Sequence, residues 1–169
     1  GARSFCGMKH VGLNVAADPL FTASYTGVNA GMVIAVADDP GMHSSQNEQD
    51  SRHYAKAAKL LMLEPSDSEE CVEYAKAAYE LSEKFDTPVI LRLTTRVDHS
   101  RSIVNIGERN DIGVKDYVKN PGKYVMMPAM AKKRHIVVED RMVAEREWAE
   151  TASINTVEYN DKKIGVISS

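Results

Sequence analysis

The strongest constraint on the fold is an alternation of short apolar runs with longer amphipathic stretches. Residues 32–37 are all apolar, 60–63 and 89–94 are rich in aliphatic residues, and the stretches between them have helical character. Such apolar runs are typical of strands covered on both faces, and strands that alternate with helices form parallel sheets through crossover connections. The sequence therefore predicts an α/β fold, a doubly wound parallel sheet with helices on both faces.

The remaining elements extend this pattern. We expect a further strand at 3–8 and a helix at 11–25 that Pro19 kinks or restarts. Ser66 and Glu69 have the spacing of a capping box for a helix that ends near Phe85. The predicted domains are an α/β domain at 1–101, a surface excursion with a charged helix at 102–163, and the start of a following domain at 164–169. The charged helix resembles a strap or a subunit contact.

Composition excludes several classes of protein. The net charge of −3 over 169 residues gives no basic surface for nucleic acid, and the apolar runs are too short to span a membrane. The two isolated cysteines exclude a disulfide framework and an iron–sulfur cluster bound by this chain alone. These properties predict a cytoplasmic, reducing environment.

Polar loops follow three of the predicted strands, and the carboxyl ends of parallel strands meet at one edge of a sheet. We therefore expect these side chains at that edge: Lys9, His10, Asn14, Asp38, Asp39, His43, Ser44, Ser45, Gln46, Asn47, Glu48, Gln49, Arg96, His99 and Arg101. Two interpretations stay open, a ligand site or loops that are polar because they are exposed. The spacing is not that of a metal site, so none is predicted.

Several segments resemble one enzyme family. They are "MKHVGLNVAADPL", "YTGVNAGMVIAVADDPGMHSSQNEQDSRHYAK", "LEPSD", "PVILRLTTRVDHSR", "RHIVVEDR" and "KKIGVIS". In this order and spacing they are similar to the alpha subunit of the indolepyruvate type of 2-oxoacid:ferredoxin oxidoreductase. The resemblance covers nearly the whole chain, and "DDPGMHSSQNEQD" is its most specific motif.

The resemblance implies most of a thiamine diphosphate-binding domain of the pyrimidine type, followed by an extended C-terminal strap with a helix. It implies oxidative decarboxylation of aryl pyruvates to acyl-CoA, with electrons passing to ferredoxin. Mg²⁺ would be bound by another domain, and 4Fe-4S clusters would lie elsewhere in the parent protein. Implied partners are the other domains of the alpha subunit, a beta subunit, ferredoxin and coenzyme A, in an oligomer.

The family's cofactor-activating glutamate falls in a motif upstream of Gly1, so the chain is expected to be inactive alone. The resemblance makes His43 and His10 the catalytic candidates. The candidates for substrate or cofactor binding are Lys9, Gly12, Asn14, Asp38, Asp39, Ser44, Ser45, Gln46, Asn47, Glu48, Arg96 and His99. An ion pair of Arg96 with Asp38 or Asp98 is an equal alternative for that arginine, and a backbone hydrogen bond is one for His10.

Two other functions remain open at this point. One is the same chemistry on another 2-oxoacid, such as pyruvate or 2-oxoglutarate. The other is a non-catalytic module whose strand-end surface is a subunit interface.

Overall fold

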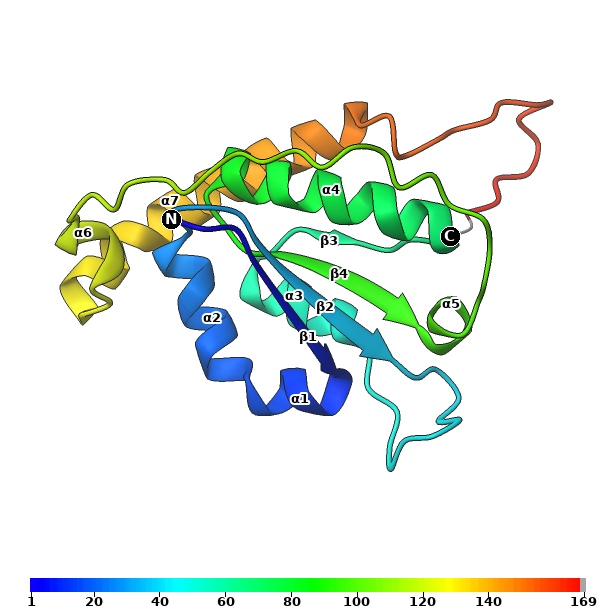
Figure 1. Cartoon of the computed structure of the whole chain (residues 1–169), viewed down its shortest axis with the longest axis horizontal. Helices are drawn as coiled ribbons and strands as arrows, with labels where there is room; N and C mark the ends of the chain where they lie inside the picture. Colours follow the sequence, from blue (N-terminus) through cyan, green and yellow to red (C-terminus); the bar gives the residue numbers. More distant parts are fainter. Residues whose placement is uncertain (168–169) are drawn as a thin grey trace.

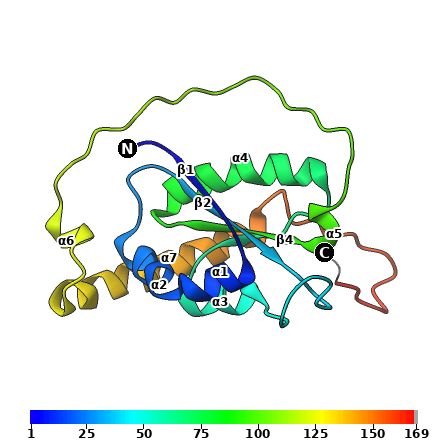
Figure 2. The same cartoon turned by 60° about the horizontal axis from the view of Figure 1, so that its bottom comes forward.

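The computed structural model describes residues 1–167 of the chain. Four parallel strands form a sheet in the order β1–β2–β4–β3, with helices on both faces (Figures 1 and 2). This arrangement confirms the predicted fold. In chain order the elements are β1 (Ser4–Lys9), α1 (His10–Val15), α2 (Ala17–Thr26), β2 (Met32–Asp38), α3 (Ser51–Ala58), β3 (Met62–Leu63), α4 (Ser68–Phe85), β4 (Val89–Thr94), α5 (Thr95–Asp98), α6 (Pro121–Tyr124) and α7 (Pro128–Thr151).

Alternate residues of the central strands face two separate cores. Val36 of β2 and Ile90 of β4 belong to the core that α1, α2 and α3 cover, together with Leu13. Val33 and Leu91 belong to the core under α4. Because side chains alternate across a strand, a run without polar residues fills both cores at once.

Two predicted helix starts differ from the observed ones. The predicted restart near Pro19 occurs at Ala16, and Pro19 lies in the first turn of α2, where its missing N–H needs no partner. The predicted capping box at Ser66 and Glu69 is wrong by one residue. Asp67 is the N-cap and accepts a hydrogen bond from the Glu70 N–H at 2.9 Å. The Glu70 carboxylate in turn accepts the N–H and the hydroxyl of Ser66.

Strand β3 is shorter than the predicted strand at 60–63. The backbone N–H of Leu60 donates to the carbonyl of Ala55 at 2.9 Å, so Leu60 still belongs to the end of α3. The predicted strand at the end of the chain is not present at 164–167, which have no regular structure, and Ser168 and Ser169 lie outside the described residues.

Residues 99–120 form an extended segment without helix or strand that passes outside α4 (Figure 2). The Lys115 N–H donates to the Gly1 carbonyl, and its ammonium group pairs with Glu83. The side chains of Ile103 and Ile106 are exposed. This segment lies on the surface, and most of its side chains are exposed.

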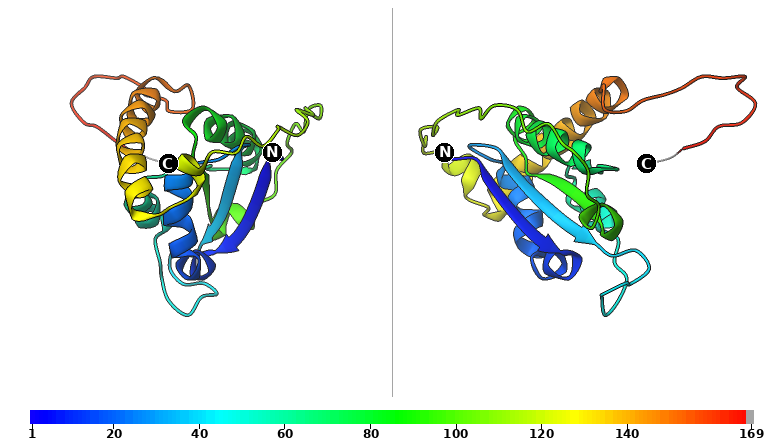
Figure 3. Two further views of the ribbon diagram at one scale, coloured as in Figure 1. Left: turned by 90° about the vertical axis from the view of Figure 1, so that its left-hand side faces the viewer. Right: turned by 45° about the vertical axis from the view of Figure 1, so that its right-hand side comes forward.

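Helix α7 packs against α2 and α4 on the side of the sheet away from β1 (Figure 3). Its buried Arg141 donates to the carbonyls of Ser24, Asp86 and, at 3.5 Å, Lys59. Ser24 lies near the end of α2, while Lys59 and Asp86 are the C-caps of α3 and α4. A single guanidinium therefore binds the carboxyl ends of three helices, where the helix dipoles favour positive charge.

Glu145 makes the stability of this region depend on pH. It lies one turn after Arg141, and burial raises the pKa of its carboxyl to about 7. Because the folded state holds this proton more tightly than the unfolded state, the contribution of Glu145 is fully present below its ordinary pKa near 4.5 and is lost as the pH rises through about 7.

We therefore expect Glu145→Gln to flatten the fall in unfolding free energy between pH 5 and pH 8, approximately the range of that titration. Urea unfolding of the wild type and the variant at both values measures this difference. Glu147→Gln, an exposed neighbour on the same helix, is the control. An identical pH dependence in wild type and Glu145→Gln would contradict the assignment.

Candidate functional site

The predicted edge of the sheet exists, and it contains the point where the sheet's topology reverses. After β2 the chain turns to the face covered by α3, whereas after β3 it turns to α4 on the opposite face. Strand β4 lies between β2 and β3, and the segment after α5 also runs past α4 (Figure 1). Crevices at such reversal points are the usual ligand sites of open parallel sheets. Residues 39–50 project from this edge.

A tight turn opens this loop. Pro40 and Gly41 are its central residues, Gly41 has a φ of +81°, and the Met42 N–H donates to the Asp39 carbonyl at 3.0 Å. These are the properties of a type II turn, which favours proline followed by glycine. The local sequence thus reverses the chain directly beyond the strand.

The carboxylate of Asp39 then holds the turned chain in place. It accepts hydrogen bonds from the backbone N–H groups of His43 and Ser44 at 3.1 and 2.8 Å. It also accepts the hydroxyls of Ser45 at 2.5 Å and Thr95 at 2.8 Å. These donors hold the pKa of the Asp39 carboxyl far below its usual range, and the Ser45 hydroxyl has the largest effect. Much of the polar content of the loop therefore serves its own architecture.

Asp39→Asn tests this clamp. Each carboxylate oxygen of Asp39 accepts a backbone N–H, so an amide NH₂ in either orientation would face another donor. We expect the variant to unfold at a lower urea concentration than the wild type, because donors of the loop would lose their acceptor. We also expect faster hydrogen exchange at the His43 and Ser44 amides.

Urea unfolding and NMR-detected exchange measure the two effects. Glu48→Gln, an exposed change in the same loop, is the control. Unchanged exchange at both amides in Asp39→Asn would rule out the clamp.

Asp38 lies deeper and belongs to a charge network that sequence analysis missed. Its carboxylate is 1% exposed and accepts the Ser51 N–H at 2.9 Å, the Ser51 hydroxyl, and the Arg92 Nε–H at 2.6 Å. Arg92 also pairs with Glu64 and approaches Asp50 at 3.9 Å. The Arg52 guanidinium hydrogen-bonds Asp50 and lowers the pKa of that carboxyl to about 2.

This network joins the carboxyl ends of β2, β3 and β4 to the N-cap of α3. The predicted alternative, an ion pair between Asp38 and Arg96, is wrong, because Arg92 occupies that position and Arg96 is exposed on α5. The sequence contained one indication of this role, because Arg92 is the only charged residue within the apolar strand at 89–94.

The loop also folds back onto the junction of β1 and α1. The Lys9 ammonium donates to the Ser44 carbonyl at 2.9 Å. His10 is 1% exposed, and its Nε2 lies 3.2 Å from the Ser45 hydroxyl oxygen. Two predicted strand-end loops are therefore in direct contact.

The other predicted site residues lie around the contact between the loop at 39–50 and the start of α1. The Asn14 side chain accepts the Tyr54 hydroxyl at 2.6 Å, and Gly12 approaches Met8 so closely that a Cβ would lie 3.1 Å from the Met8 Cβ. His43 and His99 have exposed side chains. Three further candidates of the loop are exposed: Gln46, Glu48 and Asn47, whose side-chain oxygen accepts a hydrogen bond from Gln49 at 2.8 Å.

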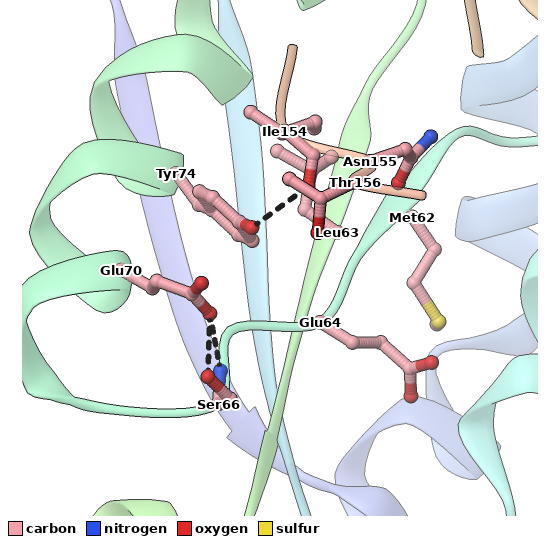
Figure 4. A pocket seen from close by; sticks show the side chains of 9 residues that line it. All are labelled: Met62, Leu63, Glu64, Ser66, Glu70, Tyr74, Ile154, Asn155 and Thr156. Carbon is pink, nitrogen blue, oxygen red and sulfur yellow. Dashed lines mark hydrogen bonds between the residues drawn. The ribbon is translucent and has the colours of Figure 1, made fainter. Parts of the chain in front are cut away.

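One cavity of the molecule lies outside the three predicted strand-end loops. Its volume is about 430 Å³, and it opens on the outer side of β3, between the start of α4 and residues 154–156 (Figure 4). Several of its polar groups are already paired, since Glu70 accepts from Ser66 and Glu64 binds Arg92. Tyr74 contacts the Ile154 carbonyl at 3.5 Å. Glu64 lines this cavity and also pairs with Arg92, but none of the predicted site residues lines it, so the cavity does not define the site.

Two properties of residues 1–167 bear on the type of protein. Within them, no three histidine, cysteine, aspartate or glutamate side chains gather as metal ligands would. None of the helices described there has the length and apolar character needed to cross a membrane.

Comparison with known proteins gives a consistent set of relatives. No protein-family model matches the chain. Indolepyruvate oxidoreductase subunit IorA of Methanothermobacter marburgensis is 48% identical over 172 residues, which cover 100% of this chain and 28% of that protein. The same subunit of Pyrococcus horikoshii is 44% identical and that of Archaeoglobus fulgidus is 42% identical, each over 99% of this chain and 27% of the relative.

The chain thus spans little more than a quarter of the length of these relatives, and the similarity extends over 99–100% of the chain. It includes the four strands and the loop at 39–50. Over nearly its whole length the chain is therefore similar to one part of the IorA subunits of indolepyruvate oxidoreductases.

Proposed function

We propose that the chain forms the aminopyrimidine- and substrate-facing side of the active site of a thiamine diphosphate-dependent 2-oxoacid:ferredoxin oxidoreductase. The substrates would be indolepyruvate and related aryl pyruvates. The observation that carries the proposal is 48% identity to an indolepyruvate oxidoreductase subunit over the whole chain. The loop at 39–50, held at the reversal point of a parallel sheet, is its structural support.

The residues present fit such a ligand pair. The outer surface of the loop carries His43, Gln46 and Asn47, whose donors suit the carboxylate and the oxo group of a 2-oxoacid. The buried Nδ1 of His10 has no hydrogen-bond partner among the described residues. When bound, thiamine diphosphate supplies the electron sink that decarboxylation of a 2-oxoacid requires.

Within this site the chain's own groups would bind and orient. His43 would hold or transfer a proton beside the substrate carboxylate, and Gln46 would donate to it. Lys9 and Asp39 would fix the loop over the reacting centre through their contacts with Ser44 and Ser45. Arg96 on α5 and His99, the C-cap of that helix, are both exposed and would face the same side of the site.

The rest of the reaction would belong to other parts of the assembly. We propose that other domains of the alpha subunit bind Mg²⁺ and the 4Fe-4S clusters. The beta subunit, coenzyme A and ferredoxin would complete the reaction in the cytoplasm. The free thiols of the exposed Cys6 and the half-buried Cys71 are compatible with a reducing environment, and the outer edge of β1 is compatible with a larger oligomer.

Alanine substitutions of His43 and Gln46 in the complete oxidoreductase test the proposal. Both side chains are exposed, so the fold should be unaffected, and each variant is expected to lower viologen reduction at least about 10-fold. Glu158→Ala, at an exposed position away from the loop, is the control. Intact assembly with lost turnover supports the site, whereas lost assembly would favour the subunit-interface function.

Substrate preference is measured in the same assay. Faster viologen reduction with indolepyruvate than with pyruvate or 2-oxoglutarate is the expected result, and the reverse order would contradict the aryl pyruvate assignment.

Calorimetric titration of this chain with thiamine diphosphate and Mg²⁺ is expected to show no binding. Low-micromolar binding would mean that the chain holds a complete cofactor site by itself.

A further inference from the structure

The hydrogen bonds between Asp39, Ser45 and His10 have a fixed direction. Asp39 is ionised, because the bonds to Ser45, Ser44 and Thr95 hold its pKa far below the usual range. A carboxylate only accepts hydrogen bonds, so the Ser45 hydroxyl donates its one proton to Asp39 across 2.5 Å. The Ser45 oxygen then offers His10 only lone pairs. The His10 Nε2, 3.2 Å away, must therefore carry a proton and donate it.

This direction determines the state of the other ring nitrogen. A neutral imidazole carries one proton, so protonation at Nε2 leaves a lone pair at Nδ1. That Nδ1 is buried and has no hydrogen-bond partner within residues 1–167. Buried polar atoms without partners are rare in folded proteins and frequently mark sites completed by a ligand or a bound water.

The chemistry of the proposed ligands identifies the one that can complete this bond. A 2-oxoacid offers acceptors at its carboxylate and oxo group, which a lone pair does not bind. The aminopyrimidine of thiamine diphosphate offers an exocyclic N–H donor. Because His10 opens α1 beside Lys9, which binds the same loop, its ring lies at the strand-end edge rather than in the middle of either core.

We propose that Asp39 and Ser45 are positioning residues that hold His10 as its Nε2–H tautomer, so that Nδ1 accepts a hydrogen bond from the amino group of the cofactor's aminopyrimidine. This inference rests on the proposed function for the identity of the ligand. The tautomer itself is a property of the chain without ligand.

NMR of the ¹⁵N-labelled chain tests the first half without any cofactor. We expect the two ring nitrogens of His10 to show protonated Nε2 and unprotonated Nδ1. Ser45→Thr keeps the hydroxyl and should keep this pattern. Ser45→Val has nearly the same shape as Ser45→Thr but no hydroxyl, and it should give a mixture of tautomers. Protonated Nδ1 in the wild type, or an unchanged pattern in Ser45→Val, would overturn the positioning role.

Two substitutions of His10 in the complete oxidoreductase test the second half. In His10→Gln the side-chain amide can still donate to Ser45 but offers nothing at the position of Nδ1. In His10→Asn an amide oxygen can take the place of Nδ1, and the contact with Ser45 is lost. The readout is the dissociation constant of thiamine diphosphate, compared with that of an analogue whose pyrimidine amino group is replaced by hydrogen.

We expect the wild type to bind thiamine diphosphate about tenfold more tightly than the analogue, the approximate value of one such hydrogen bond. His10→Gln should lose this preference and His10→Asn should retain part of it. An unchanged preference in His10→Gln would overturn the assignment of Nδ1. Absence of thiamine diphosphate binding by the wild-type complex would instead contradict the proposed function, so the two failures are distinguishable.

Discussion

Replacing Arg92 by methionine is expected to lower the unfolding free energy by about 3–5 kcal/mol, the usual cost of removing one partner from a buried ion pair. Asp38 would keep only its Ser51 donors, and its carboxylate is fully buried. Glu64 and Asp50 would lose their shared cation at the same time. Methionine fills much of the arginine's volume, so the loss is chiefly electrostatic.

Urea unfolding measures the effect, and Arg96→Met is the matched control. Arg96 lies four residues later on an exposed surface, where substitutions usually change stability by no more than about 0.5 kcal/mol. In a double-mutant cycle, Arg92→Met combined with Asp38→Asn should be less destabilised than the sum of the two single changes. Equal stability of Arg92→Met and Arg96→Met would refute the network.

The second large effect is expected from Arg141→Met, which should cost roughly 3 kcal/mol or more, because several charge-assisted hydrogen bonds disappear together. The guanidinium bonds the Asp86 carbonyl at 3.1 Å and both the carbonyl and the hydroxyl oxygen of Ser24 at 3.0 Å. The buried carbonyls at the ends of α2 and α4 would then lack these partners. Unfolding in urea measures the total loss.

Hydrogen exchange locates the effect. We expect faster exchange along α7 and in the last turns of α2, α3 and α4, while the amides of β2 and β4 change less. Arg146→Met, exposed on the same helix, should leave both stability and exchange near their wild-type values. Loss of stability without any local change around α7 would show that Arg141 does not act through these helix ends.

Hydrophobic patterning was enough to predict the sheet, because the apolar runs that form β2 and β4 are continuous and the helices between them are amphipathic. It also brought the correct loops to one edge, since that result depends only on strand direction. Boundaries were less predictable. Ser66 and Asp67 are both good N-caps, and only the folded backbone decides between them.

The buried charges could not be predicted in the same way. Arg92 and Arg141 are each more than nine-tenths buried, yet a hydrophobic pattern assigns arginine to the surface. Their partners are distant in sequence, Asp38 for one and Ser24 for the other. The direct contact between His10 and Ser45 was likewise hidden, because the loop's turn and the Asp39 clamp determine where Ser45 lies.

The guanidinium that joins three helix ends also has a consequence for synthesis. Arg141 lies 117 residues after Ser24, so α2, α3, the sheet and α4 leave the ribosome before the side chain that completes them. Contacts between such distant residues form late and slowly. We infer that the nascent chain stays loosely packed until α7 has emerged. A version of the protein truncated before Pro128 would then be a poor substitute for the domain, although it contains all four strands.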